Sequence, residues 1–98
     1  MGITSVDPAA LRAAALRMDT AADIVLGILR AHLADLRFDA VAAGRDYGAA
    51  GAAVREVLDR LVADVTQWAV AARETGAALR VGADRYGDAE SRAVAALR

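Results

Sequence analysis

The most constraining feature of this sequence is a heptad-like spacing of apolar residues over two long stretches. In the first stretch, apolar residues recur every three or four positions at Leu11, Ala14, Met18, Ala21, Ala22, Val25, Ile28, Leu29, Leu33 and Leu36. In the second stretch, the same spacing runs through Ala50, Val54, Val57, Leu58, Leu61, Val65, Trp68, Ala72, Thr75 and Leu79. This period places the apolar side chains on one face of an α-helix. The sequence therefore predicts two long amphipathic helices.

The composition fits this prediction and argues against a β-sheet protein. Of the 98 residues, 27 are Ala, which has the highest helix propensity, and all 12 basic residues are Arg, which is also a good helix former. One Pro and four aromatic residues do not match a β-sandwich or a β-barrel, because strands are enriched in aromatic residues. We therefore expect an all-α fold.

Local signals predict where the helices begin and end. Asp7 is suited to cap a helix that starts at Pro8, because an aspartate side chain accepts a backbone N–H and proline favours the first helical position. Gly44, Gly48 and Gly51 lie between the two apolar stretches, together with turn-compatible Asp residues. These residues predict a break between the helices.

The predicted architecture is a single antiparallel two-helix hairpin domain over residues 1–98. Its first helix is expected at about 8–37, its turn at about 38–48 and its second helix at about 49–82. Folding back around the middle of this turn would place Met18 opposite Trp68, Val25 opposite Leu61 and Leu11 opposite Thr75.

In this register, everything from Leu79 onward overhangs the hairpin. The apolar stripe nevertheless continues along the overhang, through Leu79, Ala83, Tyr86, Glu90, Ala93 or Val94, and Leu97. We therefore predict a helical C-terminal tail over residues 83–98 that docks onto another protein.

Further apolar stripes predict association with other helices. Leu16 and Ile24 flank the first stripe, and Val62, Val70 and Val81 flank the second. A chain of this length has a limited core, and without Cys it has no disulfide to stabilise it. We expect assembly into a four-helix bundle or a higher oligomer, with either a second copy or another helical hairpin as the partner.

The chemistry-bearing residues do not form a recognisable active site. The absence of Cys excludes a thiolate metal site and a cysteine nucleophile, and the single histidine, His32, excludes a multi-histidine zinc site. His32 is interpreted as a packing or edge residue, and most carboxylates lie near Arg on solvated helix faces. Gly44–Gly48 lacks the ending of a phosphate-binding loop. We expect no catalytic, metal or cofactor site, and a protein that is not an enzyme.

Charge and hydropathy exclude two further classes. The net charge is −1 with acidic and basic residues interleaved, so nucleic-acid binding is not expected. No uncharged run approaches the roughly 20 residues of a membrane-spanning helix. The first seven residues lack the basic and apolar regions of a Sec signal peptide, so export, if it occurs, is expected to use another route.

Tyr86 and Glu90 stand one helical turn apart on the predicted tail. At these residues, and in the segments Val6–Leu11 and Leu79–Glu90, the sequence resembles an EspC-like member of the small helical-hairpin proteins exported by type VII (ESX) secretion in actinobacteria. Tyr86 and Glu90 fit the Tyr-x-x-x-Asp/Glu export motif of that family. The Trp-x-Gly turn of the related WXG branch is missing, because the only Trp is Trp68 inside the second helix.

The resemblance implies a function and a mechanism. The hairpin would be made in the cytoplasm, travel folded with another helical hairpin, and reach the cell envelope or the outside of the cell. Its tail, with the export motif Tyr86 and Glu90, would be read by the membrane-associated ATPase of the secretion system. The alternative is a cytosolic helical adaptor or immunity-type interaction module that is not exported. The residues expected in the core or at a partner interface are Leu11, Met18, Val25, Leu29, Leu61, Val65, Trp68 and Leu79.

Overall fold

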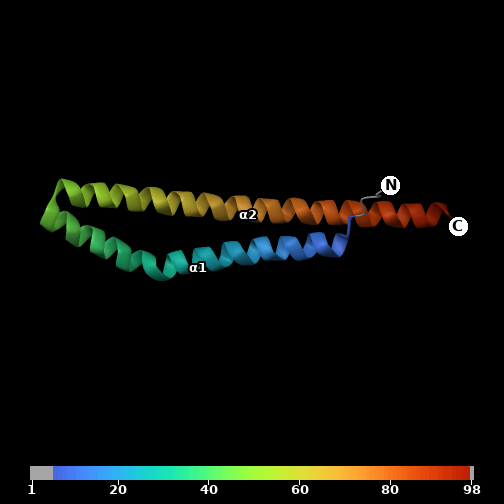
Figure 1. Cartoon of the computed structure of the whole chain (residues 1–98), viewed down its shortest axis with the longest axis horizontal. Coiled ribbons are helices and arrows are strands. Elements are labelled where there is room, and N and C mark those ends of the chain that lie inside the picture. Colours follow the sequence, from blue (N-terminus) through green and yellow to red (C-terminus); the bar gives the residue numbers. More distant parts are fainter. Residues whose placement is uncertain (1–5, 98) are drawn as a thin grey trace, which may run out of the picture. The chain divides into compact units, whose positions relative to one another are not determined.

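The computed structural model describes residues 6–97 and shows two long helices joined by one residue (Figure 1). Helix α1 spans Pro8–Tyr47 and helix α2 spans Ala49–Ala96. The described part of the chain contains no strand. The predicted all-α helical hairpin is confirmed.

The start of α1 follows the predicted capping chemistry. The Asp7 Oδ1 atom accepts a hydrogen bond from the backbone N–H of Ala9 at 2.9 Å, and the Leu11 N–H donates to the Asp7 carbonyl oxygen at 3.1 Å. Pro8 is the first helical residue. The cap therefore satisfies backbone donors that a helix N-terminus leaves without partners.

The predicted end of the first helix and the predicted turn at 38–48 are wrong. Helix α1 continues for ten residues beyond position 37, and only Gly48 separates it from α2. Gly48 has a φ of 56° and its N–H donates to the Gly44 carbonyl oxygen at 3.1 Å. This left-handed glycine is the usual way to end an α-helix. Gly44 costs a helix interior only about 1 kcal/mol, and the neighbouring alanines favour continuation.

Contacts divide the chain into two compact units. Unit 1 contains residues 1–21 and 71–98, and unit 2 contains residues 22–70, including the Gly48 turn. In unit 1, Arg12 pairs with Asp84 and Asp19 pairs with Arg80. Because the α2 numbers fall as the α1 numbers rise, the two segments of unit 1 run antiparallel.

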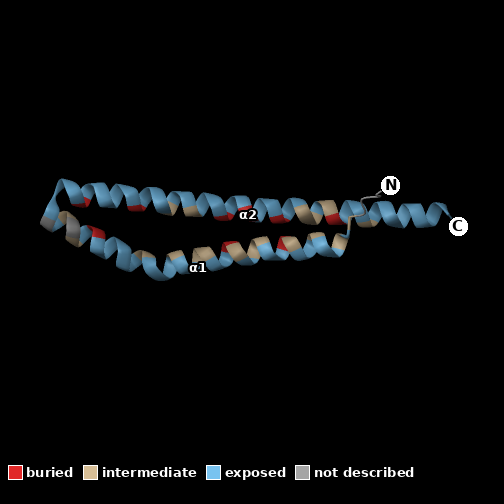
Figure 2. Cartoon of the chain, in the orientation of Figure 1, coloured by how far each residue is buried: buried red, intermediate tan, exposed pale blue. Residues whose placement is uncertain are grey.

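The helix–helix seams are built from small residues. Among the described residues, the buried apolar side chains are Ala15, Ala22, Ala40, Leu58, Ala69, Ala72 and Ala83, and none of the larger side chains is completely buried. Figure 2 shows that most of the surface of both helices is exposed. Such seams bring helix backbones close together but leave the larger apolar side chains partly or largely in water.

The predicted register is also wrong in unit 1. A Cβ atom placed on Gly82 would lie 4.0 Å from Leu11 Cδ1, so Leu11 packs near Gly82 and not opposite Thr75. Arg80, Gly82 and Asp84 all contact α1, although everything from Leu79 onward was expected to overhang. The cause is the single-residue turn, which shifts every pairing toward the C-terminus of α2.

Candidate functional site

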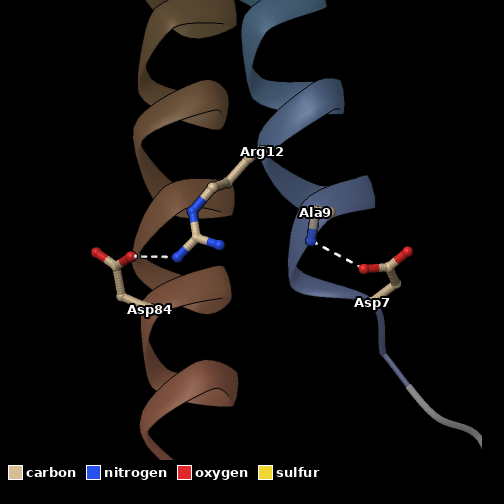
Figure 3. A network of polar contacts seen from close by, with 4 residues as sticks. All are labelled: Asp7, Ala9, Arg12 and Asp84. Atoms are coloured by element: carbon tan, nitrogen blue, oxygen red, sulfur yellow. Dashed lines mark hydrogen bonds and ion pairs between the residues drawn. The ribbon is translucent and has the colours of Figure 1, made fainter.

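The candidate site is the C-terminal part of α2, from Arg85 to Leu97. The Arg12–Asp84 pair, at 2.9 Å, lies near the first turn of α1 (Figure 3), and α2 continues beyond that turn in Figure 1. Every residue from Arg85 to Leu97 is exposed except Gly87, which is partly covered. The segment is nevertheless helical to Ala96. The expected helical tail is therefore present, but it is continuous with α2 and its uncovered part begins later than predicted.

Tyr86 and Glu90 lie on one face of this segment, since residues four apart are neighbours on a helix surface. Tyr86 is 46% exposed, and Val94, one turn beyond Glu90, is 53% exposed. Gly87, Glu90, Ser91, Val94 and Ala95 line a shallow hollow on the same segment. The face thus offers an aromatic ring, a carboxylate and an apolar side chain in a row. A face of this kind fits the groove of a protein that binds amphipathic helices.

Two ion pairs precede this face on α2. Arg12 and Asp84 have side chains that are 52% and 70% exposed, and an exposed pair of this kind contributes at most about 1 kcal/mol. Arg80 Nη2 contacts Asp19 Oδ2, and these two side chains are 43% and 31% exposed. Both pairs join residues far apart in the sequence, so their geometry depends on how α1 and α2 are aligned.

The residues expected in the core or at a partner interface are partly covered or exposed in the structure. None of the eight is buried. Partly covered are Leu11, Met18, Val25, Leu29, Val65 and Leu79, and exposed are Leu61 and Trp68. Most large apolar side chains at the heptad positions therefore flank the seams, which are filled by alanine and by Leu58.

Sequence reasoning missed the role of the small residues. The notable close approach is at Gly76, where a Cβ atom would lie 3.2 Å from the Ala15 carbonyl oxygen and 3.1 Å from Asp19 Oδ1. At Gly27, by contrast, a Cβ atom would meet nothing within 4 Å. The available signal was the spacing of Gly76 four residues before Arg80, which puts both on one face of α2.

Unit 2 carries its own exposed apolar surface. Val25, Asp64, Val65 and Trp68 line a shallow hollow whose lining is apolar, and Trp68 is 46% exposed. Other large apolar residues of this unit that are exposed are Ile24, Ile28, Leu36, Phe38, Val41, Tyr47, Val54, Val57, Leu61 and Val70. Extended apolar surface of this kind is typical of protein–protein contact sites.

The described residues were also compared with the requirements of a metal site and of a membrane span. His32 is exposed on α1. Within residues 6–97, no three His, Cys, Asp or Glu side chains are grouped so that they could hold a metal ion. Neither described helix contains a stretch apolar enough for a membrane span.

Comparison with known families identifies one match. A family model described as "Excreted virulence factor EspC, type VII ESX diderm" matches residues 1–98. The search of curated proteins and the search of solved structures gave no match.

Proposed function

This chain belongs to the EspC family of excreted type VII (ESX) proteins, and from this membership we propose that it is a substrate or secretion-associated protein whose export signal is the Tyr86–Glu90 face of α2. The observation that carries the proposal is the placement of this face. It lies beyond the last α2 residue that is ion-paired with α1 in the described structure, on an exposed helical segment.

The receptor of this face is the membrane-associated ATPase of the secretion system. A helix that is already formed loses less conformational entropy on binding than a disordered peptide does. Tyr86 supplies an aromatic anchor, which is the type of side chain that dominates binding energy at protein interfaces. Glu90 supplies one charge that a basic group of the receptor can pair with.

The second part of the proposal is travel as an assembly of helical hairpins. The support is the exposed apolar surface of unit 2, which includes Ile28, Val57 and Trp68. A second hairpin would cover this surface and form a four-helix bundle or a higher oligomer. The chain acts through these helix contacts and not through catalysis.

The test of the signal is export of the Tyr86→Ala variant in a host with a working type VII system. We expect the variant to stay in the cell while its helicity, measured by circular dichroism, is unchanged, because Tyr86 is exposed. The matched control is Tyr47→Ala, since Tyr47 is also exposed (72%) but lies beside the turn. Export of the Tyr86→Ala variant at the level of the control would contradict the proposal and favour a retained helical adaptor.

A further inference from the structure

The apolar seam of unit 1 opposes a shift of α2 along α1 in one direction more than in the other. The fully buried apolar side chains of its described residues are the methyl groups of Ala15, Ala72 and Ala83, and Gly76 is buried with them. Identical small side chains present a smooth surface, because there is no large knob that fits a single hole. Sliding α2 by one turn in one direction would put Trp68 and Leu79 where Ala72 and Ala83 now lie, and sliding it the other way would put Gly76 and Gly87 there. The seam therefore opposes the first shift sterically, whereas the second shift must be opposed by other groups.

Two ion pairs and one glycine also constrain the register of α2 on α1. Arg80 contacts Asp19, and Arg12 contacts Asp84 at 2.9 Å. Gly76 lies between the Ala15 carbonyl oxygen and the Asp19 carboxylate, at distances where an added Cβ atom would be only 3.2 and 3.1 Å away. The Ala15 oxygen belongs to the backbone, so it cannot turn aside as a side chain could.

A shift of one turn in either direction is penalised. Moving α2 by four residues, about one helical pitch, in one direction would bring Arg80 opposite Arg12 and put the methyl group of Ala72 where Gly76 now lies. The opposite shift would bring Asp84 opposite Asp19 and Asp88 opposite Arg12, and it would put the Arg80 side chain where Gly76 now lies. Like charges that face each other repel, and each shift breaks both existing pairs, although the second shift forms a new one between Arg12 and Asp88. Of these three registers, only the observed one makes two pairs of opposite charge and places glycine at the closest approach.

The register also decides whether Tyr86 is free. Gly82 now packs against Leu11. The shift that brings Asp84 opposite Asp19 would carry Tyr86 into the place of Gly82, beside α1. The ring would then be partly covered and unable to enter a receptor groove.

We propose that Asp19–Arg80, Arg12–Asp84 and Gly76 form a register lock, whose role is to hold α2 where the Tyr86–Glu90 face is free for recognition. The lock acts by positioning and does not itself touch the receptor. Only the role in recognition rests on the proposed export function, since the effect of the lock on the register can be measured without export.

The absence of Cys makes the register directly measurable. Spin labels on Ala13→Cys and Ala78→Cys, both at exposed positions of unit 1, report the distance between α1 and α2. In this background we expect Asp19→Arg to shift or broaden the distance distribution, since a slip of one pitch moves α2 by roughly 5 Å along α1, and to reduce export. The swapped variant with Asp19→Arg and Arg80→Asp should restore both the distance and export. The milder Asp19→Asn serves if Asp19→Arg does not fold.

The control is the Glu56–Arg60 pair, which is made at 2.8 Å within α2 and therefore holds no register. Glu56→Arg should leave the distance and export unchanged. An unchanged distance distribution in both Asp19 variants would overturn the lock, even if Tyr86→Ala still blocks export. If an Asp19 variant has a shifted register but normal export, and export still needs Tyr86, the positioning role of the register lock would be overturned. Export that needs neither Tyr86 nor the register would instead reject the proposed signal.

Discussion

At the residue scale, the glycines of the two helices differ in what surrounds them. A Cβ atom at Gly76 would crowd the Ala15 carbonyl oxygen, whereas Cβ atoms at Gly27 and Gly87 would meet no atom within 4 Å. Glycine costs a helix interior about 1 kcal/mol relative to alanine wherever it sits. Of these three glycines, only Gly76 makes a close approach within the chain that offsets this cost.

This contrast predicts that the same substitution, glycine to alanine, changes the free energy of unfolding in opposite directions at Gly27 and Gly76. Gly27→Ala should raise the free energy of unfolding by up to about 1 kcal/mol, from helix propensity. Gly76→Ala should lower it by about 1–2 kcal/mol, because forcing the helices apart costs more than propensity returns. Urea unfolding followed by circular dichroism measures both. Equal stabilisation by the two variants would show that the close approach at Gly76 is absent in solution.

At the scale of the helices, local chemistry predicted the beginning of α1 but not its end. Asp7 and Pro8 act through neighbouring backbone groups, so the capping pattern is readable from the sequence. Gly44, Gly48 and Gly51 are all compatible with a turn, and only the three-dimensional arrangement shows which one forms it. Gly48 is the one with a positive φ.

The turn provides a second stability prediction. Gly48→Ala should lower the free energy of unfolding by about 1–2 kcal/mol, because a side chain disfavours the left-handed conformation. Gly48→Asn should cost less, since asparagine tolerates that conformation better. A steric clash does not contribute to this change in stability, because a Cβ atom at Gly48 meets nothing within 4 Å. Gly51→Ala does not serve as a control, since Gly51 is buried; Gly27→Ala does. If alanine and asparagine left stability unchanged, the one-residue turn would be wrong.

The register shows where sequence patterns stop being informative. On α1 most residues of the predicted stripe are partly covered, because the period of a stripe is a property of the helix itself, whereas on α2 most of them, including Leu61, Trp68 and Thr75, are exposed. The alignment of α1 on α2 depended on the length of the turn and on Asp19, Gly76 and Arg80, which are far apart in the chain. An error in the turn therefore moved every predicted contact of unit 1. The prediction that Tyr86 and Glu90 share one helix face did not depend on the register, since their spacing is local.

At the scale of the whole molecule, exposed apolar side chains make association the main expectation. We predict that the purified chain forms a dimer or higher oligomer, or binds a partner hairpin that is produced with it. Ile28→Asp and Val57→Asp should weaken this association while helicity is kept, because both residues are more than half exposed in the free chain. Size-exclusion chromatography with light scattering measures the effect.

The control for association is Gln67→Glu, which adds the same type of charge to an exposed polar position of α2. It should leave the molar mass unchanged. Two results together would contradict the association prediction. The wild-type chain would be a stable monomer that binds no helical partner, and its free energy of unfolding would equal that of both Asp variants.

The central claim, that the Tyr86–Glu90 face is what the secretion system reads, is tested most directly by the secreted fraction of two matched variants. Glu90→Ala removes the carboxylate from the face, and Asp88→Ala removes a carboxylate that is also exposed, two residues away and on a different side of the helix. We predict that Glu90→Ala is retained in the cell and that Asp88→Ala is secreted like the wild type. Equal secretion of the two variants would contradict the claim.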